Sequence, residues 1–142
     1  MVKSHLSIRP MVEHDTNFIY NSWLKSAQAD HDLPNSKFFD SYRDHIKEIL
    51  KRSKVIVACD PEDPTFLHGY MVCQQVEGVF ILHWVYVKAP FRKMGVASDL
   101  IRSEFPALKQ EPLVITYKNN KRSKMYDSLK TIYKPEFRSI QI

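Results

Sequence analysis

The feature that most constrains this chain is a junction between a strand-like segment, residues 79–87, and a helix-like segment, residues 96–105. Residues 92–97, which lead into the helix-like segment, read Arg-Lys-Met-Gly-Val-Ala. The first turn of a helix carries unpaired backbone N–H groups and the positive end of the helix dipole, so a loop that leads into it suits an anion. A glycine there lets a phosphate approach the backbone without a Cβ in the way. The junction therefore predicts a site for the pyrophosphate of a nucleotide-like cofactor.

The chain is basic, with a formal net charge of +5 and an isoelectric point of about 9.2. Such a charge suits an anionic ligand, but it equally suits a nucleic acid or a solvated basic surface. The basic run at residues 118–124 is the clearest nucleic-acid feature. No zinc-ligand spacing, aromatic RNA-binding signature or helix-turn-helix pattern accompanies it. RNA is therefore an alternative partner that the sequence does not favour.

Length and composition predict a single domain over residues 1–142. No apolar stretch reaches the roughly 18 residues of a membrane helix, and no signal-peptide core follows the N-terminus. We therefore expect a cytoplasmic protein without a membrane partner, as a monomer or a homodimer. Cys59 and Cys73 lie in strand-like runs without metal-ligand spacing, so we expect two reduced core thiols and no metal site.

Apolar periodicity and turn residues predict the remaining elements. Strands are expected at residues 6–9, 55–59, 67–75, 79–87, 113–117 and 137–142, and helices between Asp15 and a polar break at residues 30–34, then at residues 36–50, 96–105 and from 123 to about 132. The order is β-α-α-β-β-β-α-β-α-β. It predicts an α+β or α/β fold, a mixed central β-sheet flanked by helices. Residues 79–117 form one strand–helix–strand crossover, expected to be right-handed and parallel.

This element order and the loop motif resemble the GNAT superfamily of acyl-CoA-dependent N-acyltransferases. The family's motif has Arg or Gln, two residues, Gly, one residue, then Gly or Ala; here Arg92, Gly95 and Ala97 match it, with Val87 five residues before the Arg. The preceding hairpin, with Gly69-Tyr70 on its first strand, adds to the likeness. The resemblance implies a single GNAT-like domain. It also implies an N-acetyltransferase that moves an acetyl group from acetyl-CoA directly to a primary amine and releases CoA.

The cofactor contacts follow from the loop and from the resemblance. They are expected at Val85, Val87, Arg92, Lys93, Met94, Gly95, Val96, Ala97, Asn119 and Arg122. The resemblance implies that a backbone N–H between Val85 and Val87 polarises the thioester carbonyl, and that Asn119 contacts the cofactor. Arg122, with its basic neighbours, is expected to bind the 3′-phosphate of the adenosine, with a solvated basic run as the alternative.

Two side chains are expected to move protons. His83 is the candidate general base, because a histidine near its ordinary pKa accepts a proton at neutral pH. Arylalkylamine N-acetyltransferases are similar here, because they have a histidine at the same offset from the motif. Strand alternation places His83, Val85 and Val87 on one face; the alternative is a hydrogen-bonded core histidine. Tyr126 stands seven residues after Asn119, and the resemblance implies that it protonates the departing thiolate.

The acceptor is the least defined part. The family usually has Gly-Phe four and five residues after the tyrosine, where this chain has Lys130-Thr131. By analogy, the acceptor enters between the first two helices and the turn at residues 76–78, near Asp30, His31, Asp32 and Glu77. These groups either attract a cationic amine or are ordinary loop residues. A GNAT-fold protein without turnover, serving as a binding or structural module, is the alternative function.

The role of Tyr126 can be tested by Tyr126→Phe, which keeps the ring and removes the hydroxyl. If that hydroxyl protonates the thiolate, turnover falls by about 10- to 10,000-fold, the usual range for one proton-transfer group. Binding of CoA, measured by calorimetry on the same protein, is expected to be unchanged. Wild-type turnover in Tyr126→Phe would exclude the role.

Overall fold

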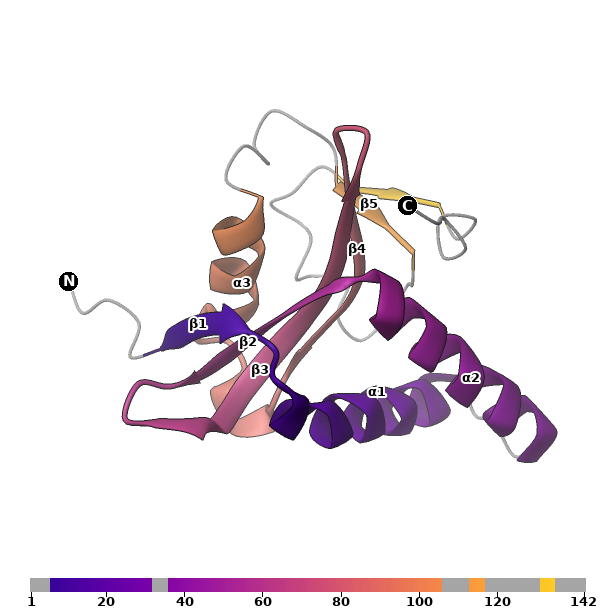
Figure 1. Ribbon diagram of the computed structural model, residues 1–142, viewed down its shortest axis with the longest axis horizontal. Coiled ribbons are helices and arrows are strands. Elements are labelled where there is room, and N and C mark those ends of the chain that lie inside the picture. Colours follow the sequence, from indigo (N-terminus) through magenta and orange to yellow (C-terminus); the bar gives the residue numbers. More distant parts are fainter. Residues whose placement is uncertain (1–5, 32–35, 106–112, 117–130, 135–142) are drawn as a thin grey trace.

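The structure is a computed structural model that describes residues 6–31, 36–105, 113–116 and 131–134 (Figure 1). Its core is one mixed β-sheet, which in this described part has six strands in sequence order. The strands are β1 (Ser7–Pro10), β2 (Lys54–Asp60), β3 (Asp63–Val76), β4 (Val79–Val87), β5 (Leu113–Ile115) and β6 (Thr131–Tyr133). Strands β1 to β4 are antiparallel, whereas β4, β5 and β6 run parallel. The expected mixed sheet, and the parallel pairing across the crossover, are confirmed.

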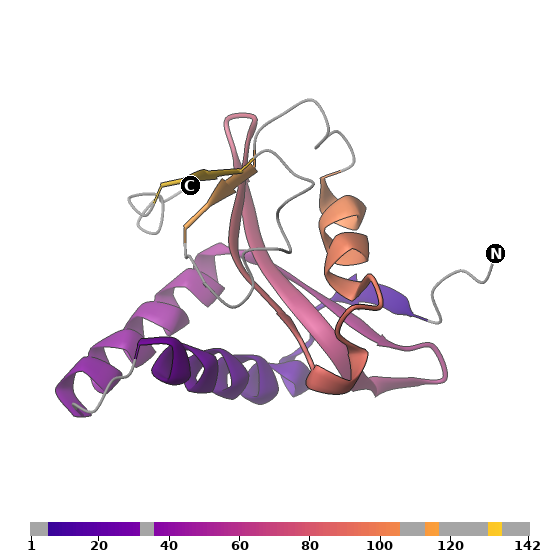
Figure 2. The same cartoon turned by 180° about the vertical axis from the view of Figure 1, so that it is seen from behind.

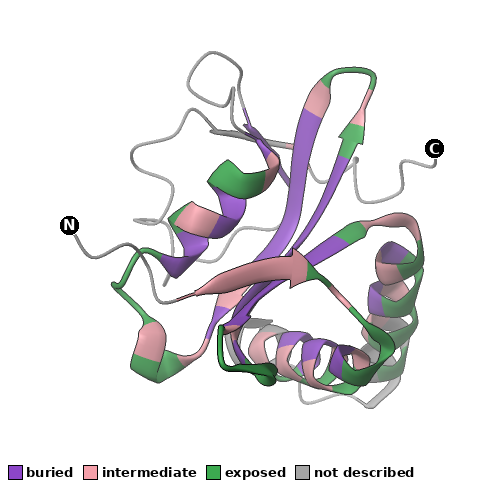
Figure 3. Ribbon diagram, turned by 60° about the vertical axis from the view of Figure 1, so that its left-hand side comes forward, coloured by how far each residue is buried: buried purple, intermediate pink, exposed green. Residues whose placement is uncertain are grey.

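Helices cover both faces of the sheet. The described helices are α1 (Thr16–His31), α2 (Ser36–Arg52) and α3 (Val96–Glu104), with short 3₁₀ turns η1 (Glu13–Asp15) and η2 (Ala89–Phe91). Helices α1 and α2 lie on one side and α3 on the other (Figures 1 and 2). Strand β4 and residues 67–74 of β3 are therefore mostly buried on both faces, as the colouring of Figure 3 shows. This explains why residues 79–87 are almost continuously apolar.

Two apolar clusters fill the space on either side of the sheet. The α3-side cluster includes Leu82, Val85 and Leu100. The α1-side cluster includes Trp23 of α1 and Trp84 of β4, whose rings stack with centroids 5.3 Å apart. Cys59 and Cys73 are free and buried in these cores, as expected, and burial raises the pKa of Cys73 to about 12. That thiol is therefore protonated and inert at neutral pH.

The C-terminal part differs from the expected elements. The last helix was expected to reach about Ile132, but Thr131–Tyr133 form β6, in which Ile132 pairs with Val114 of β5. Pairing with a neighbouring strand outweighs local helical periodicity for these β-branched and aromatic residues. The rest of that predicted helix, residues 123–130, and the predicted strand at residues 137–142 lie outside the described residues. Helix α1 also continues to His31, past the start of the expected break.

A β-bulge interrupts β4 at His83. Val72 of β3 pairs with Trp84, and the next residue, Cys73, pairs with Leu82, so His83 is one extra residue on β4. The extra residue shifts the alternation of side chains along the strand: Leu82 and Val85 both belong to the α3-side cluster, and Trp84 to the α1-side cluster. The expectation that His83 shares a face with Val85 and Val87 is therefore wrong. His83 is hydrogen-bonded to the side chains of Gln74 and Thr116. Each of these two residues directly follows a residue of the α3-side cluster in the sequence, so their side chains point to the α1 side.

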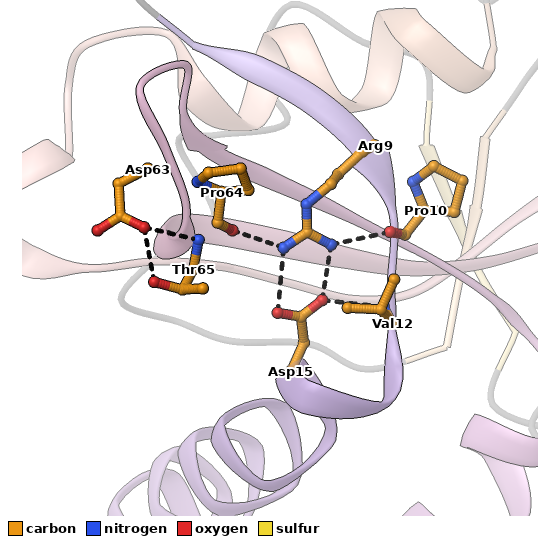
Figure 4. Close-up of polar contacts among 7 residues, drawn as sticks. All are labelled: Arg9, Pro10, Val12, Asp15, Asp63, Pro64 and Thr65. Atoms are coloured by element: carbon orange, nitrogen blue, oxygen red, sulfur yellow. Dashed lines mark hydrogen bonds and ion pairs between the residues drawn. The ribbon is translucent and has the colours of Figure 1, made fainter.

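One ion pair fixes the start of α1 to the sheet (Figure 4). Arg9 of β1 donates to both carboxylate oxygens of Asp15, at 2.8 and 3.2 Å, and to the carbonyl of Pro64 at 2.6 Å. The Asp15 carboxylate, 1% exposed, also accepts from the amide of Val12 at 2.9 Å. Burial alone would raise the pKa of Asp15, but the hydrogen bonds from Arg9 and Val12 outweigh it, so its pKa lies below the usual value. The pair joins β1, the segment before α1 and the start of β3.

Asp15→Asn removes the charge that Arg9 requires and is expected to lower the free energy of unfolding by about 2 kcal/mol, the scale of a hydrogen bond to a charged group. Because the native pKa is depressed, the contribution of Asp15 is complete above about pH 4 and is lost as the pH falls through the native pKa. Urea unfolding at pH 7 and pH 3 checks both points, since the gap between wild type and variant should shrink at pH 3. Asp44→Asn, an exposed change on α2, should stay within about 0.5 kcal/mol of wild type. An equal gap at both pH values would contradict the assignment.

Candidate functional site

The loop at residues 92–97 alternates between positive and negative φ angles before α3 begins. Lys93 and Gly95 have positive φ angles of 65° and 84°, whereas Met94 between them and Val96 at the start of α3 do not. Such alternation of positive and negative φ is found in backbone nests, whose successive N–H groups bind anions. The sequence predicted the location of this loop. The positive φ of Lys93, which is unusual for a residue with a side chain, is a feature that only the structure shows.

The N-terminus of α3 adds its own donors to this loop. Gly95 is the N-cap residue and supplies no side-chain cap, and the amide of Asp99 makes the first intrahelical hydrogen bond, to the carbonyl of Gly95 at 2.9 Å. The amides of Val96, Ala97 and Ser98 precede that bond and so have no partner within the helix. A Cβ on Gly95 would meet no atom within 4 Å. Open space therefore lies beside Gly95, at the end of α3 to which these amides belong.

The predicted cofactor residues of this loop differ in what they offer. Val96 and Ala97 are buried in the α3-side cluster, so only their backbones face a ligand. Met94 is 67% exposed and Lys93 is exposed. Arg92 turns back toward β4: its Nε–H donates to the carbonyl of Val87 at 2.9 Å, and its guanidinium lies 6.0 Å from the centre of the Tyr86 ring. Arg92 thus marks the boundary between the loop and the end of β4.

The end of β4 extends beyond its described pairing with β5. That pairing covers Phe80 to Leu82, and the amide of Thr116 donates to the carbonyl of Leu82 at 3.3 Å. Val85 and Val87 lie farther along β4, with both side chains buried on the α3 side. On the other neighbour, Gly69 of β3 stands opposite Val87, and a Cβ there would collide with the carbonyl oxygen of Tyr86. Only glycine allows β3 to approach the backbone of β4 this closely.

A cleft of about 510 Å³ opens beside this end of β4. It is lined by Phe18, Asn21, Ser22, Lys25 and Ser26 of α1, with Tyr86 of β4 and Arg92 of the loop. The rings of Phe18 and Tyr86 meet edge to face, with centroids 6.2 Å apart. Arg92 therefore borders both the cleft and the amide loop.

The Lys88 ammonium lies close to the cleft. It stands 4.8 Å from the centre of the Phe18 ring and 5.0 Å from that of Phe66. Burial between these rings lowers the pKa of Lys88. Two aromatic faces attract a cation, so this contact holds the residue that follows β4 in place.

His83 lies in a closed hydrogen-bonded site instead of the cleft. It is 1% exposed, with Nε2 2.6 Å from the Gln74 side-chain oxygen and Nδ1 2.9 Å from the Thr116 hydroxyl. An amide oxygen only accepts, so Nε2 carries the hydrogen and the lone pair of the neutral ring is on Nδ1, facing Thr116. Gln74 is oriented in turn by its bond to the carbonyl of Arg52 at 3.4 Å. This geometry favours the core-histidine alternative over a general base.

Several predicted residues lie outside the described residues: Asn119, Arg122 and Tyr126, together with Asp32. Glu77 is exposed in the turn between β3 and β4, at the opposite end of β4 from Tyr86. The cleft is therefore not at the turn of residues 76–78 where the acceptor was expected. The α1 residues that line the cleft were missed, although Phe18, Ser22 and Ser26 recur every four residues beside the apolar stripe of Ile19 and Trp23.

The described part of the chain shows neither a metal-binding cluster nor a membrane-spanning helix. It holds no group of three or more His, Cys, Asp or Glu side chains that would bind a metal ion. Among the described helices, none is long and apolar enough to cross a membrane.

Comparison with known proteins gives the fold a name. No family model matches the sequence, and no curated protein matches it. Among solved structures, a putative acetyl transferase from Pyrococcus furiosus is 18% identical, with 96% of this chain and 93% of the other covered at a TM-score of 0.62. A protein described as histone acetyltransferase HPA2 and related acetyltransferase, from Corynebacterium glutamicum, is 14% identical over 87% and 83%, with a TM-score of 0.64. A ribosomal-protein-alanine N-acetyltransferase from Brucella melitensis is 14% identical over 87% and 89%, with a TM-score of 0.58. The chain therefore has a GNAT-like fold, as expected from the sequence.

His83→Leu fills a similar volume and removes both ring nitrogens. It removes the hydrogen bonds that the Gln74 oxygen and the Thr116 hydroxyl make with the ring, so the free energy of unfolding should fall by about 2–4 kcal/mol. His14→Leu, an exposed histidine of η1, should change it by less than about 0.5 kcal/mol. Urea unfolding measures both. A stable His83→Leu protein that has lost the acid limb of its rate–pH profile would restore the general-base role.

Proposed function

We propose that this protein binds an acyl-CoA, acetyl-CoA in the simplest case, at residues 92–97 and transfers the acyl group to a primary amine in the adjoining cleft. The carrying observation is the loop of alternating positive and negative φ that leads from Lys93 into the N-terminus of α3 and adjoins, at Arg92, a cleft of about 510 Å³. One element serves the phosphates of the cofactor and the other holds the acceptor. The GNAT-like fold supports the same assignment, since this fold is found in proteins described as acetyltransferases.

The phosphates account for the loop residues. The amides of residues 93–97 receive the pyrophosphate, and Lys93 adds a positive charge. Asn119 and Arg122 remain expected contacts from the motif resemblance. The pantetheine arm then runs along the end of β4, where an amide between Val85 and Val87 would polarise the thioester carbonyl. This route leads the thioester to Tyr86 and Arg92, at the edge of the cleft.

The transfer itself balances without a covalent enzyme intermediate. The acceptor ammonium loses one proton, and the neutral nitrogen attacks the thioester carbonyl carbon. The C–N bond forms, the C–S bond breaks, and the second proton leaves the nitrogen as the thiolate is protonated. The products are an amide, CoA thiol and one released proton. Tyr126 is the proposed donor to the thiolate, on the strength of the motif resemblance.

We propose that water, instead of His83, accepts the proton that the acceptor ammonium loses first, because the lone pair of the His83 ring faces Thr116. The positive charge of the cleft favours the neutral form of the acceptor amine. Lys25 and Arg92 line it, and nearby positive charges lower the pKa of an ammonium. The acid limb of the rate–pH profile then belongs to the acceptor and moves with the pKa of the amine that is used.

Gly95→Glu tests the phosphate site. The new side chain would occupy the open space beside the loop amides and repel phosphate, so affinity for CoA should fall at least about 100-fold, the scale of a lost charged contact. Gly95→Gln is the matched control, because it shares the bulk and the strain of a positive φ but carries no charge. Calorimetric titration with CoA should rank wild type above Gly95→Gln, and Gly95→Gln above Gly95→Glu. Equal affinity of a folded Gly95→Glu protein and wild type would sink the assignment. CoA binding without turnover of any amine would favour a binding module.

A further inference from the structure

The walls of the cleft have one sign of charge. Among the described residues that line it, Lys25 and Arg92 are charged and none is acidic. Lys88, held over the ring of Phe18, adds a third cation next to the same wall. A simple cationic amine would enter this cleft against repulsion from each of these groups.

The two lining cations have donors available to a ligand. Arg92 uses Nε–H for the carbonyl of Val87, and no described residue accepts from its two terminal nitrogens. Lys25 is exposed on α1, and no described carboxylate pairs with it. A guanidinium and an ammonium at the rim of one small cleft suit an anionic group, because both donate charge-assisted hydrogen bonds.

The remaining lining residues are two aromatic side chains and three uncharged polar ones, Asn21, Ser22 and Ser26. Phe18 and Tyr86 present their rings, and the Ser22 hydroxyl is bonded to the Tyr70 hydroxyl at 2.8 Å and to the carbonyl of Ile19 at 3.1 Å. Apolar walls with a few placed polar groups are typical of small-molecule sites, and about 510 Å³ is in their size range.

We infer that the acceptor is a small amine that also carries an anionic group and an apolar body, of the class of an amino acid. The inference rests on the proposed function and names its substrate class. The carboxylate binds Lys25 and Arg92, the apolar group lies against Phe18 and Tyr86, and the amine is left at the end of β4 where the thioester arrives. The same cations that hold the carboxylate repel the ammonium, so the zwitterion binds by its anionic end and reacts as the neutral amine.

Phenylalanine and 2-phenylethylamine test this, because they differ only in the carboxylate. With acetyl-CoA, kcat/KM for phenylalanine should exceed that for phenylethylamine by at least about 10-fold, and spermidine should be poorer than phenylalanine. Lys25→Gln should raise the KM for phenylalanine and so reduce this preference about 3- to 10-fold, which is the effect expected for one partly exposed charge. Lys25→Glu should reduce the preference further. Lys51→Gln, an exposed lysine on α2 that does not line the cleft, should leave it unchanged. O-phosphoethanolamine beside ethanolamine shows whether a phosphate replaces the carboxylate as the anionic group.

The inference and the proposed function fail in different ways. The affinities of the two products, N-acetylphenylalanine and N-acetylphenylethylamine, measured by titration in the presence of CoA, repeat the comparison without turnover. CoA binding that depends on Gly95, together with equal or better use of phenylethylamine, overturns the inference and leaves the proposed function standing. A preference for phenylalanine that Lys25→Glu does not alter also overturns the inference. Absence of CoA binding overturns both.

Discussion

The single extra residue on β4 is the constraint on which the rest of the arrangement depends. Val72 pairs with Trp84 and the next residue, Cys73, pairs with Leu82. The alternation of side chains along β4 therefore shifts by one residue at His83. Leu82 and Val85 consequently both face α3, and Trp84 is free to stack on Trp23 of α1. A bulge also adds local twist, which fits the end of the described pairing between β4 and β5 at Leu82. The hydrogen bonds of His83 to Gln74 and Thr116 satisfy the extra residue inside the core and thereby fix its position.

The two parts of the candidate site come together through one side chain. The amide loop leads into α3 on one side of the sheet, and the cleft is lined by α1 on the other (Figure 1). Arg92 joins them, since it starts the loop, donates to the last residue of β4 and lines the cleft. Its Nε–H is engaged by the Val87 carbonyl, and this bond holds the planar group across the boundary. An Arg92→Lys change would keep the charge but not the fork, and so would separate electrostatics from geometry.

Much of the fold was predictable because its signals are local. The strand–loop–helix junction at residue 92, the hairpin of β3 and β4, and the apolar spacing of α2 are each encoded in one continuous stretch of the chain. The bulge was not predictable: residues 79–87 are apolar on both faces, so no alternation of polar residues records the change of phase at His83. The use of Thr131–Tyr133 as β6 depends on pairing with Leu113–Ile115, far along the chain. The wall of the cleft depends on how α1 packs against Tyr86, which its own periodicity does not specify. The predicted roles of Asn119, Arg122 and Tyr126 stay predictions.

Strand β1 has a consequence for how copies of this protein meet. Among the described strands it stands at one end of the sheet, so within this part of the chain its outer backbone groups form an edge onto which another strand could be added. That edge is only four residues long, it ends in a proline, which has no N–H to donate, and it carries Arg9 clamped onto Asp15. A short, charged, proline-ended edge is a poor template for intermolecular β-sheet. The same arginine that anchors α1 thus also protects the sheet from growing by aggregation.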